Sequence, residues 1–277
     1  MKRRTLCSWS LGALLAPMSW AQQTNGAVRK PGPNWRLLIN EAVTGETNIF
    51  VLTNRYQGLA DYISAQPKGR AIGIEPVVDI RRFMSLAQGG SKPDLVFGKS
   101  VNQMAKLVRD SGYQPVVRRS DEYKAAFIVG KGVNVKSLAE VKGEKIIMPD
   151  EYAATTAVAK AELRRQNVTN PRIIHVRYQE AVAQQVQAGL ADVGVVNPST
   201  AKKWAEQGGR VLAETRPVAN WSLLASPSMP AEEVNALRDA LIGMNKQAPT
   251  VLASLGFKEW ARADRKEYLE LLDYTKE

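Results

Sequence analysis

The sequence predicts an α/β fold with two lobes, each a mostly parallel sheet flanked by helices. Short apolar segments typical of buried strands alternate from Trp35 onward with segments whose apolar residues recur at helical spacing. Two stretches, 86–100 and 186–199, share one order: a helix end, a glycine, an aspartate, an apolar strand and a serine that opens the next helix. This repeated arrangement indicates two lobes of the same kind.

The first half of the chain supplies three strand–helix units. Apolar residues at three- and four-residue spacing mark the helices, and the glycine pair 89–90 marks the end of the second one. Ser100 and Gln103 match a capping box, so we expect the third helix to begin there. The expected strands are 36–40, 74–78 and 94–98, and the expected helices are 56–64, 80–87 and the segment after Ser100.

The second half continues the alternation, with glycines again at the helix ends. The expected strands are 125–129, 145–148, 172–176, 193–196, a segment around Val211, and 221–225. The expected helices are a short one at 137–142, one after Met148, then 180–188, 200–207, a stripe over 234–244 and most of 247–277. The apolar stripes of the last helices are interpreted as core and packing surface.

The first 21 residues have the organisation of a secretory signal peptide. Three basic residues at 2–4 precede an apolar run over 6–16, and Ser19-Trp20-Ala21 offers a cleavage site. We expect cleavage after Ala21 and a polar linker over 22–34; a disordered cytoplasmic N-terminus is the alternative, and Sec and twin-arginine export stay open. Cleavage removes Cys7, the only cysteine, so no disulfide or thiolate is expected.

The composition and motifs of the sequence argue against a nucleic-acid-binding protein, a membrane-spanning protein and an enzyme. The formal net charge of +11 falls to +8 when the three basic residues at 2–4 are removed, but the remaining basic pairs are scattered along the chain. No apolar run is long enough to span a membrane. The only histidine, His175, lies inside an expected strand, and no Ser-centred elbow, phosphate loop or His/Asp/Glu cluster occurs. We therefore expect no catalytic residue, no metal and no cofactor.

Four segments, in order, resemble one family. These are RYQGLADYI (55–63), GSKPDLVFG (90–98), VNVKSLAEVKGEKIIMPD (133–150) and QAGLADVGVV (187–196). They are similar to segments of the periplasmic solute-binding proteins of phosphate/phosphite/phosphonate ABC transporters, which have the type II periplasmic binding fold. The resemblance spans roughly 36–245.

The resemblance implies a first lobe of 35–122 plus 218–277, a second lobe of 123–217, and closure on the ligand by a hinge. It also implies a periplasmic, monomeric, non-enzymatic protein. Such a protein captures a small anionic solute, a phosphonate- or phosphite-like oxyanion, and presents it to an ABC permease in the inner membrane.

Candidate ligand-binding residues lie where strands end and helices begin, because helix N-termini attract anions. Tyr56 matches the family's ligand-side tyrosine, although Gly58 replaces the expected proline. Lys99 places a cation at a strand end or is a solvated lysine, and Ser100 contacts ligand or only caps its helix. The full set is Tyr56, Lys99, Ser100, Tyr152, Thr155, Thr156, Asn197 and Ser199.

The segment after Met148 departs most from the family. The family has Asp-Pro-x-Ser-x-Ser-Gly, whereas residues 150–156 read DEYAATT. If Asp150 is the N-cap, the threonines lie inside the helix; if 150–154 is a loop and Thr155 opens the helix, an anion cradle with fewer hydroxyls survives, and we favour the second. Glu151 would repel a dianion there, so a carboxylate, a sulfonate or a zwitterion bound by an exported sensor or accessory protein is the alternative. We expect Thr155→Ala and Tyr56→Ala to weaken binding with little loss of stability.

Overall fold

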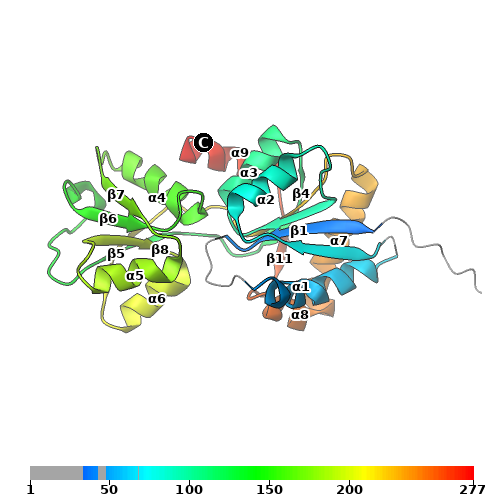
Figure 1. Ribbon diagram of the computed structural model, residues 1–277, viewed down its shortest axis with the longest axis horizontal. Coiled ribbons are helices and arrows are strands. Elements are labelled where there is room, and N and C mark those ends of the chain that lie inside the picture. Colours follow the sequence, from blue (N-terminus) through cyan, green and yellow to red (C-terminus); the bar gives the residue numbers. More distant parts are fainter. Residues whose placement is uncertain (1–33, 43–47, 68) are drawn as a thin grey trace, which may run out of the picture. The chain divides into compact units, whose positions relative to one another are not determined.

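Two β-sheets, each covered by helices on both faces, make up the computed structural model, which describes residues 34–42, 48–67 and 69–277 (Figure 1). The predicted signal peptide and linker, apart from Asn34, lie outside the described residues. Within the part of the chain that is described, no helix combines the length and apolarity that crossing a membrane requires.

The first sheet has six strands in the order β11-β4-β10-β3-β1-β2. Strand β1, next to the edge strand β2, pairs in parallel with β2 and β3, whereas β10 runs antiparallel to β3 and β4, and β11 antiparallel to β4. The strands are β1 (Trp35–Asn40), β2 (Ile72–Pro76), β3 (Leu95–Gly98), β4 (Gln114–Arg119), β10 (Ser222–Ala225) and β11 (Trp260–Arg262).

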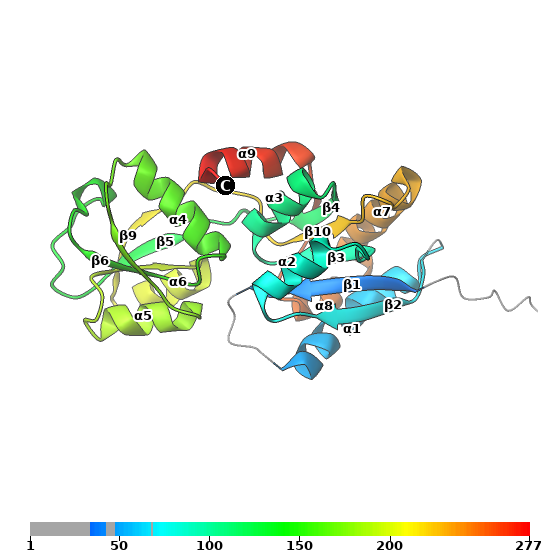
Figure 2. The same cartoon turned by 45° about the horizontal axis from the view of Figure 1, so that its top comes forward.

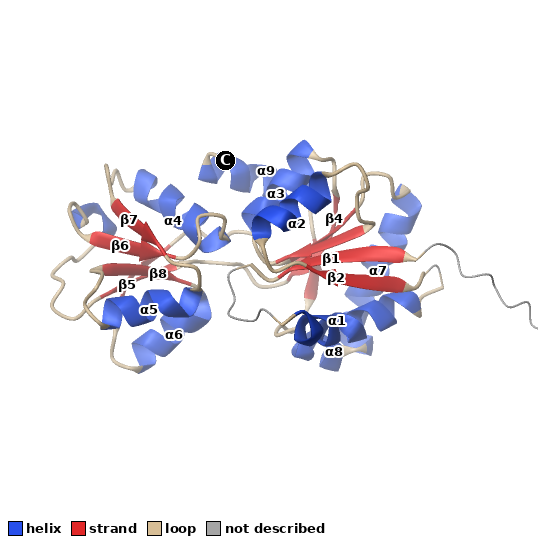
Figure 3. Ribbon diagram, in the orientation of Figure 1, coloured by secondary structure: helices blue, strands red, loops and turns tan. Residues whose placement is uncertain are grey.

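Alternating side chains of these strands pack into two separate apolar layers. One layer joins the sheet to α1, α7 and α8, and the other joins it to α2, α3 and α9 (Figures 1 and 3). The helices are α1 (Ile49–Ser64), α2 (Ile80–Gln88), α3 (Val101–Asp110), α7 (Ala231–Gln247), α8 (Pro249–Ser254) and α9 (Arg265–Thr275).

The second sheet has five strands in the order β7-β6-β8-β5-β9. Here β6 pairs in parallel with β7 and β8, and β5 runs antiparallel to β8 and β9. One face packs against α4 and the 3₁₀ turn η1, the other against α5 and α6. The elements are β5 (Ala126–Val129), η1 (Leu138–Glu140), β6 (Lys145–Met148), α4 (Ala154–Arg165), β7 (Arg172–His175), α5 (Gln179–Gln187), β8 (Val193–Val196), α6 (Pro198–Glu206) and β9 (Arg210–Glu214).

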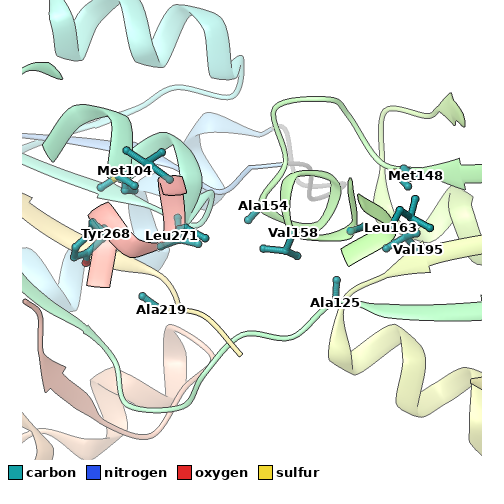
Figure 4. Close-up of a cluster of buried hydrophobic side chains, with 14 of the residues drawn as sticks. Met104, Ala125, Met148, Ala154, Val158, Leu163, Val195, Ala219, Tyr268 and Leu271 are labelled. Carbon is teal, nitrogen blue, oxygen red and sulfur yellow. The ribbon is translucent and has the colours of Figure 1, made fainter. Parts of the chain in front are cut away.

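The C-terminal helix α9 joins one apolar cluster that includes residues of both sheets (Figures 2 and 4). Tyr268 and Leu271 of α9 pack against α3, and Ala154 and Val158 represent α4 in the same cluster. The chain passes from the first sheet to the second between β4 and β5 and returns between β9 and β10. The predicted lobe limits at 122/123 and 217/218 fall in these two connections and stay a prediction.

The predicted α/β class is confirmed, with differences at particular elements. Both sheets are mixed, because the strands on either side of each crossing run antiparallel to their neighbours. Helix α1 begins seven residues before Tyr56, since the Asn48 side chain accepts hydrogen bonds from the amides of residues 50 and 51. Strand β4 was not predicted, and β11 interrupts the segment predicted to be helical.

The predicted capping box at Ser100 and Gln103 is wrong. Ser100 is the N-cap of α3, but its side chain makes no capping hydrogen bond. The Gln103 side chain instead donates to the backbone oxygen of Tyr152, in the loop before α4. The side-chain amide of Gln103, which the local pattern assigned to the cap, is therefore bound to a residue distant in sequence, Tyr152.

Candidate functional site

One cavity of about 400 Å³ is lined by the segments that follow strands of both sheets. A cavity of this size suits a small solute. Its lining combines charged, amide and hydroxyl side chains with one indole ring. The lining residues are Glu41, Ala42, Lys99, Ser100, Arg119, Asp121, Glu122, Tyr123, Ala153, Ala154, Thr155, Gln179, Asn197, Pro198, Ser199, Asn220, Trp221 and Gly256.

Four helix N-termini contribute to this lining, and Gln179 supplies that of α5. Ser100 is the N-cap of α3, Ala153 to Thr155 form the start of α4, and Asn197 to Ser199 form the start of α6. Each of these helices follows a strand of its sheet directly, so its first backbone N–H groups lie at the strand's carboxyl end. Unpaired N–H groups and the helix dipole make such ends favourable for anions.

The start of α4 settles where the two threonines lie. The helix begins at Ala154, and Asp150 is not its N-cap but accepts a hydrogen bond from the Tyr152 amide at 2.9 Å. The favoured interpretation, a loop followed by a helix, is therefore right to within one residue. The Thr156 hydroxyl donates to the Pro149 backbone oxygen at 3.0 Å and is buried, whereas Thr155 lines the cavity.

Thr155 is the centre of a short hydrogen-bonded chain. Its hydroxyl accepts from the Gln179 side-chain amide nitrogen and lies within hydrogen-bonding distance of the Tyr123 hydroxyl, both at 2.5 Å. Burial raises the pKa of Tyr123 to about 12, against the opposing effect of the Thr155 hydrogen bond, so its phenol stays protonated at physiological pH. This wall of the cavity is therefore made of neutral hydrogen-bonding groups.

Two buried polar atoms of the lining have no hydrogen-bond partner among the described residues. They are the Ser100 hydroxyl oxygen, on a residue 2% exposed, and the Gln179 side-chain oxygen, on a residue 7% exposed. Leaving such atoms unpaired is unfavourable by about 1–3 kcal/mol each. Both atoms belong to residues that face the cavity, so a ligand there would supply their partners.

The wall built by the first sheet carries a buried ion pair. The Lys99 ammonium lies 3.1 Å from Glu41 Oε1, and Glu41 also accepts hydrogen bonds from Arg55 and from the Tyr56 hydroxyl. Burial acts to raise the pKa of Glu41, but Lys99, Arg55 and Tyr56 outweigh it and hold the pKa below its usual value. Burial lowers the pKa of Lys99, and Glu41 opposes that change.

Two cations lie close to the indole ring of Trp221. Lys99 Nζ is 4.0 Å and Arg119 Cζ is 4.3 Å from centroids of its rings, a distance at which the indole stabilises positive charge. Arg119 also forms a bidentate pair with Asp121. The first-sheet wall therefore holds both its cations in place before any ligand arrives.

Comparison with known proteins identifies the family. Residues 48–268 match the family model described as the periplasmic substrate-binding protein of a phosphonate ABC transporter. The chain belongs to this family. The resemblance stated from sequence is thereby confirmed, and with it a periplasmic substrate-binding role alongside an ABC permease. No curated protein sequence matches significantly.

Solved structures of similar fold include other binding proteins. A Xanthomonas citri protein bound to a chloride ion matches with a TM-score of 0.73 and 17% identity, over 87% of this chain and 97% of that one. PhnD1 from Prochlorococcus marinus, in complex with methylphosphonate, matches with a TM-score of 0.69 and 14% identity, over 87% and 97%. At these identities the likeness establishes the fold alone: the two-lobed fold of periplasmic binding proteins.

A third similar structure is a binding-protein component of an ABC phosphonate transporter from Pseudomonas aeruginosa. It matches with a TM-score of 0.65 and 16% identity, over 87% of this chain and 85% of that one.

The structure brings together most of the residues that the sequence singled out for this binding protein. The predicted residues that line the cavity are Lys99, Ser100, Thr155, Asn197 and Ser199. Asn197 uses its side-chain oxygen to cap α6 through the Thr200 amide, and the Ser199 hydroxyl donates to that same oxygen.

Three predicted residues are not brought to the cavity. Tyr56 is 1% exposed and lies behind Glu41, to which its hydroxyl donates. Thr156 is directed at Pro149. Tyr152 has its ring under Arg81, at 5.1 Å, and its backbone oxygen accepts from Asn102 and Gln103 of α3.

Sequence reasoning missed several residues of the lining. Glu41 follows β1, and Gln179 opens a helix shortly after β7, so the same strand-end rule applied to every strand points to both. Arg119, Tyr123 and Trp221 lie in or beside the two crossings between sheets. No local pattern marks them, because only the pairing of the crossing segments places them at the cavity.

Proposed function

We propose that this protein is exported by a cleavable signal peptide over 1–21 and acts in the periplasm as a monomeric, non-enzymatic binding protein. It captures a small oxyanion, a phosphonate or phosphite, in the cavity at the strand ends and presents it to an ABC permease of the inner membrane. The observation that carries the proposal is the meeting of four helix N-termini, those of α3, α4, α5 and α6, at one cavity.

The side chains of the lining support an anion further. Lys99 supplies a cation that is only 10% exposed, so water screens its charge weakly. The hydroxyls of Ser100 and Thr155 add hydrogen-bonding groups from opposite sheets. Although Glu41 pairs with Lys99, Arg55 also contacts Glu41, and the three groups together keep one net positive charge.

Glu151, which argued from sequence against a dianion, does not line the cavity. Its carboxylate pairs with Arg81 at 3.3 Å, with both side chains more than half exposed. Its repulsion of a bound anion is therefore reduced by its partner and by solvent. This weakens one of the two reasons given for a sensor with a pocket for another class of ligand; the other, the smaller number of hydroxyls in 150–156, stands, since Thr156 is directed at Pro149.

A binding role also fits the lack of a catalytic set among the cavity residues. His175, the only histidine of the sequence, contacts the Pro149 backbone oxygen at 2.8 Å through Nδ1 and does not line the cavity. The Tyr123 phenol, Lys99 and the hydroxyls are hydrogen-bond donors suited to holding an oxyanion unchanged.

The test combines native mass spectrometry of freshly purified protein with calorimetric titration of methylphosphonate, phosphite, phosphate and sulfate. We expect a phosphonate or phosphite to bind, and Lys99→Gln to weaken it by roughly tenfold to a hundredfold, because a charge-assisted hydrogen bond is lost. The control is Lys202→Gln, whose side chain on α6 is 79% exposed. If no oxyanion binds and none co-purifies, the proposed ligand class is refuted and a sensor or accessory role is favoured.

A further inference from the structure

The side-chain oxygen of Gln179 is an unpaired hydrogen-bond acceptor on a residue that lines the cavity, beside the hydroxyls of Thr155 and Tyr123. Gln179 is the first residue of α5 and is only 7% exposed. Its Oε1 has no hydrogen-bond partner among the described residues. Its Nε2 donates to the Thr155 hydroxyl at 2.5 Å. Because Oε1 and Nε2 share one carbon, this acceptor lies beside the hydroxyl that the proposed function assigns to the ligand.

The amide donates through Nε2 to Thr155, which leaves Oε1 as its unpaired atom. Thr155 accepts from Gln179, so its own proton is available to Tyr123, whose hydroxyl lies 2.5 Å away. The phenol proton of Tyr123 is then free to point into the cavity that Tyr123 lines. With Thr155 donating to Tyr123, the chain from Gln179 through Thr155 ends in the Tyr123 phenol as a donor, and Oε1 of Gln179, a residue of the same lining, is the unpaired acceptor.

A fully deprotonated oxyanion satisfies the donor, Tyr123, but not the acceptor, Gln179 Oε1. It accepts from Tyr123, from Ser100 and from the backbone N–H groups, but it brings a negative oxygen against Gln179 Oε1, which has no proton to give. An oxyanion that keeps one O–H satisfies the acceptor as well. A buried acceptor that finds no donor lowers affinity strongly, and sites of this kind discriminate between ligands that differ by a single hydrogen.

We propose that Gln179 selects the singly protonated form of the oxyanion, by accepting a hydrogen bond from its P–OH. The ligand class is then a hydrogen phosphonate or hydrogen phosphite monoanion. A sulfonate of the same shape and charge, which carries no proton, is rejected. This inference rests on the proposed function, because it concerns the ligand of the same cavity.

The decisive experiment compares methylphosphonate with methanesulfonate by calorimetric titration, over a pH range that spans the second ionisation of methylphosphonate. We expect methanesulfonate to bind roughly tenfold to a hundredfold more weakly than the methylphosphonate monoanion. Above the second ionisation, the affinity for methylphosphonate should fall by about tenfold for each pH unit, since only the protonated form binds.

Methanesulfonate also serves as the control for titration of the protein. The charged and titratable groups that line the cavity are Glu41, Lys99, Arg119, Asp121, Glu122 and Tyr123, and His175 lies behind the start of α4. Any change in their protonation alters the binding of both ligands, whereas the proposed selection alters only that of methylphosphonate. The ratio of the two affinities is therefore the quantity to follow with pH.

A pair of variants assigns the selection to Gln179. Gln179→Leu removes the acceptor, and we expect it to lose most of the discrimination between the two ligands. Gln184→Leu changes an exposed glutamine of the same helix and should keep the discrimination. Circular dichroism verifies that both variants fold; should Gln179→Leu fail to fold, the wild-type comparison still decides.

The possible outcomes separate this inference from the proposed function. Absence of binding by either ligand at every pH, together with absence of phosphite binding, overturns the proposed function. Binding of methylphosphonate with equal affinity for methanesulfonate, or with an affinity that rises with pH, leaves the function standing and overturns the role of Gln179. The second result would mean that the amide donates to the ligand.

Discussion

Lys99 and Glu41 form an ion pair that is almost completely withdrawn from water: Nζ lies 3.1 Å from Oε1, and the side chains are 10% and 3% exposed. Arg55 and Tyr56 donate hydrogen bonds to Glu41 and hold its carboxylate in position beside Lys99. The pair connects the cavity to the interior of the first sheet. The contribution of this ion pair to the stability of the protein and its role in ligand binding can be tested separately.

Replacing Glu41 by Gln should destabilise the protein by about 3–5 kcal/mol, because it leaves the buried Lys99 ammonium, 10% exposed, without this counterion. Urea unfolding followed by fluorescence measures this change. The control is Glu75→Gln, which breaks the pair with Arg36 at the surface, where the side chains are 40% and 42% exposed. That change should cost at most about 1 kcal/mol. Equal losses in the two variants would contradict a buried, structurally important pair.

The ion pair between Glu41 and Lys99 should also make the stability of the protein depend on pH. Since the folded-state pKa of Glu41 lies below its usual value, its contribution is present above the usual glutamate pKa and is lost as the pH falls through the folded pKa. Wild type should therefore lose more unfolding free energy on acidification than Glu41→Gln. Urea unfolding at neutral and acidic pH gives the difference, and parallel curves for the two proteins would exclude a lowered pKa at Glu41.

Thr155 and Thr156 are adjacent, but Thr155 should contribute mainly to ligand affinity and Thr156 mainly to stability. Thr155→Val removes the hydroxyl that joins Gln179 to Tyr123, so we expect ligand affinity to fall roughly tenfold, with a smaller effect on stability. Thr156→Val removes the hydroxyl that donates to Pro149, and should cost about 1–2 kcal/mol of stability at nearly unchanged affinity. Calorimetry and thermal unfolding on both variants test the contrast; a reversed pattern would show that the cavity assignment is wrong.

The contrast between the two threonines shows what the sequence could and could not predict. Strand–helix alternation placed α4 and its threonines at a strand end, because hydrophobic periodicity depends only on local residues. Which hydroxyl faces the ligand depends on where the helix starts. Ala153 is the N-cap without any side-chain cap, so the usual N-cap signal was missing. A one-residue difference in the start of a helix turns each side chain by about 100°.

Other parts of the site depend on contacts between distant segments. Ser100 looked like a reciprocal cap with Gln103, but Gln103 reaches the Tyr152 backbone oxygen in the other half of the chain. Arg119 and Trp221 meet at 4.3 Å although a hundred positions separate them, because Arg119 ends β4 and Trp221 immediately precedes β10, which pairs with β4. Sequence pattern identifies strands but does not determine which strands pair when the chain leaves a sheet and returns to it.

Tyr56 should prove to be a core residue whose hydroxyl acts through Glu41. It is 1% exposed and packs against Phe97, so Tyr56→Ala should cost about 3–5 kcal/mol, contrary to the small loss expected from sequence. Tyr56→Phe keeps the packing and removes only the hydrogen bond to Glu41, so it should cost about 1–3 kcal/mol. Chemical unfolding of both variants measures these values, and a nearly neutral Tyr56→Ala would contradict the burial of this ring.

The contact between α9 and α4 offers a last test, at a distance from the cavity. The Tyr274 hydroxyl donates to Glu162 at 3.1 Å, and Glu162, 2% exposed, also binds Arg165 and Gln166. The Arg164 guanidinium donates to the Thr275 backbone oxygen at 2.7 Å. These bonds fasten the C-terminal helix to the helix whose first turn lines the cavity.

A double-mutant cycle with Tyr274→Phe and Glu162→Gln should therefore give a coupling energy of about 0.5–3 kcal/mol, as expected for groups in one buried network. The matched cycle on Lys266 and Glu270, an i,i+4 pair at 3.7 Å on the exposed face of α9, should give no more than about 0.5 kcal/mol. Burial separates the two pairs: water competes for the surface pair, whereas Glu162 is only 2% exposed and water has little access to its carboxylate. Urea unfolding of the four proteins in each cycle supplies the energies, and equal coupling in the two cycles would show that α9 is not fastened to α4 through Glu162.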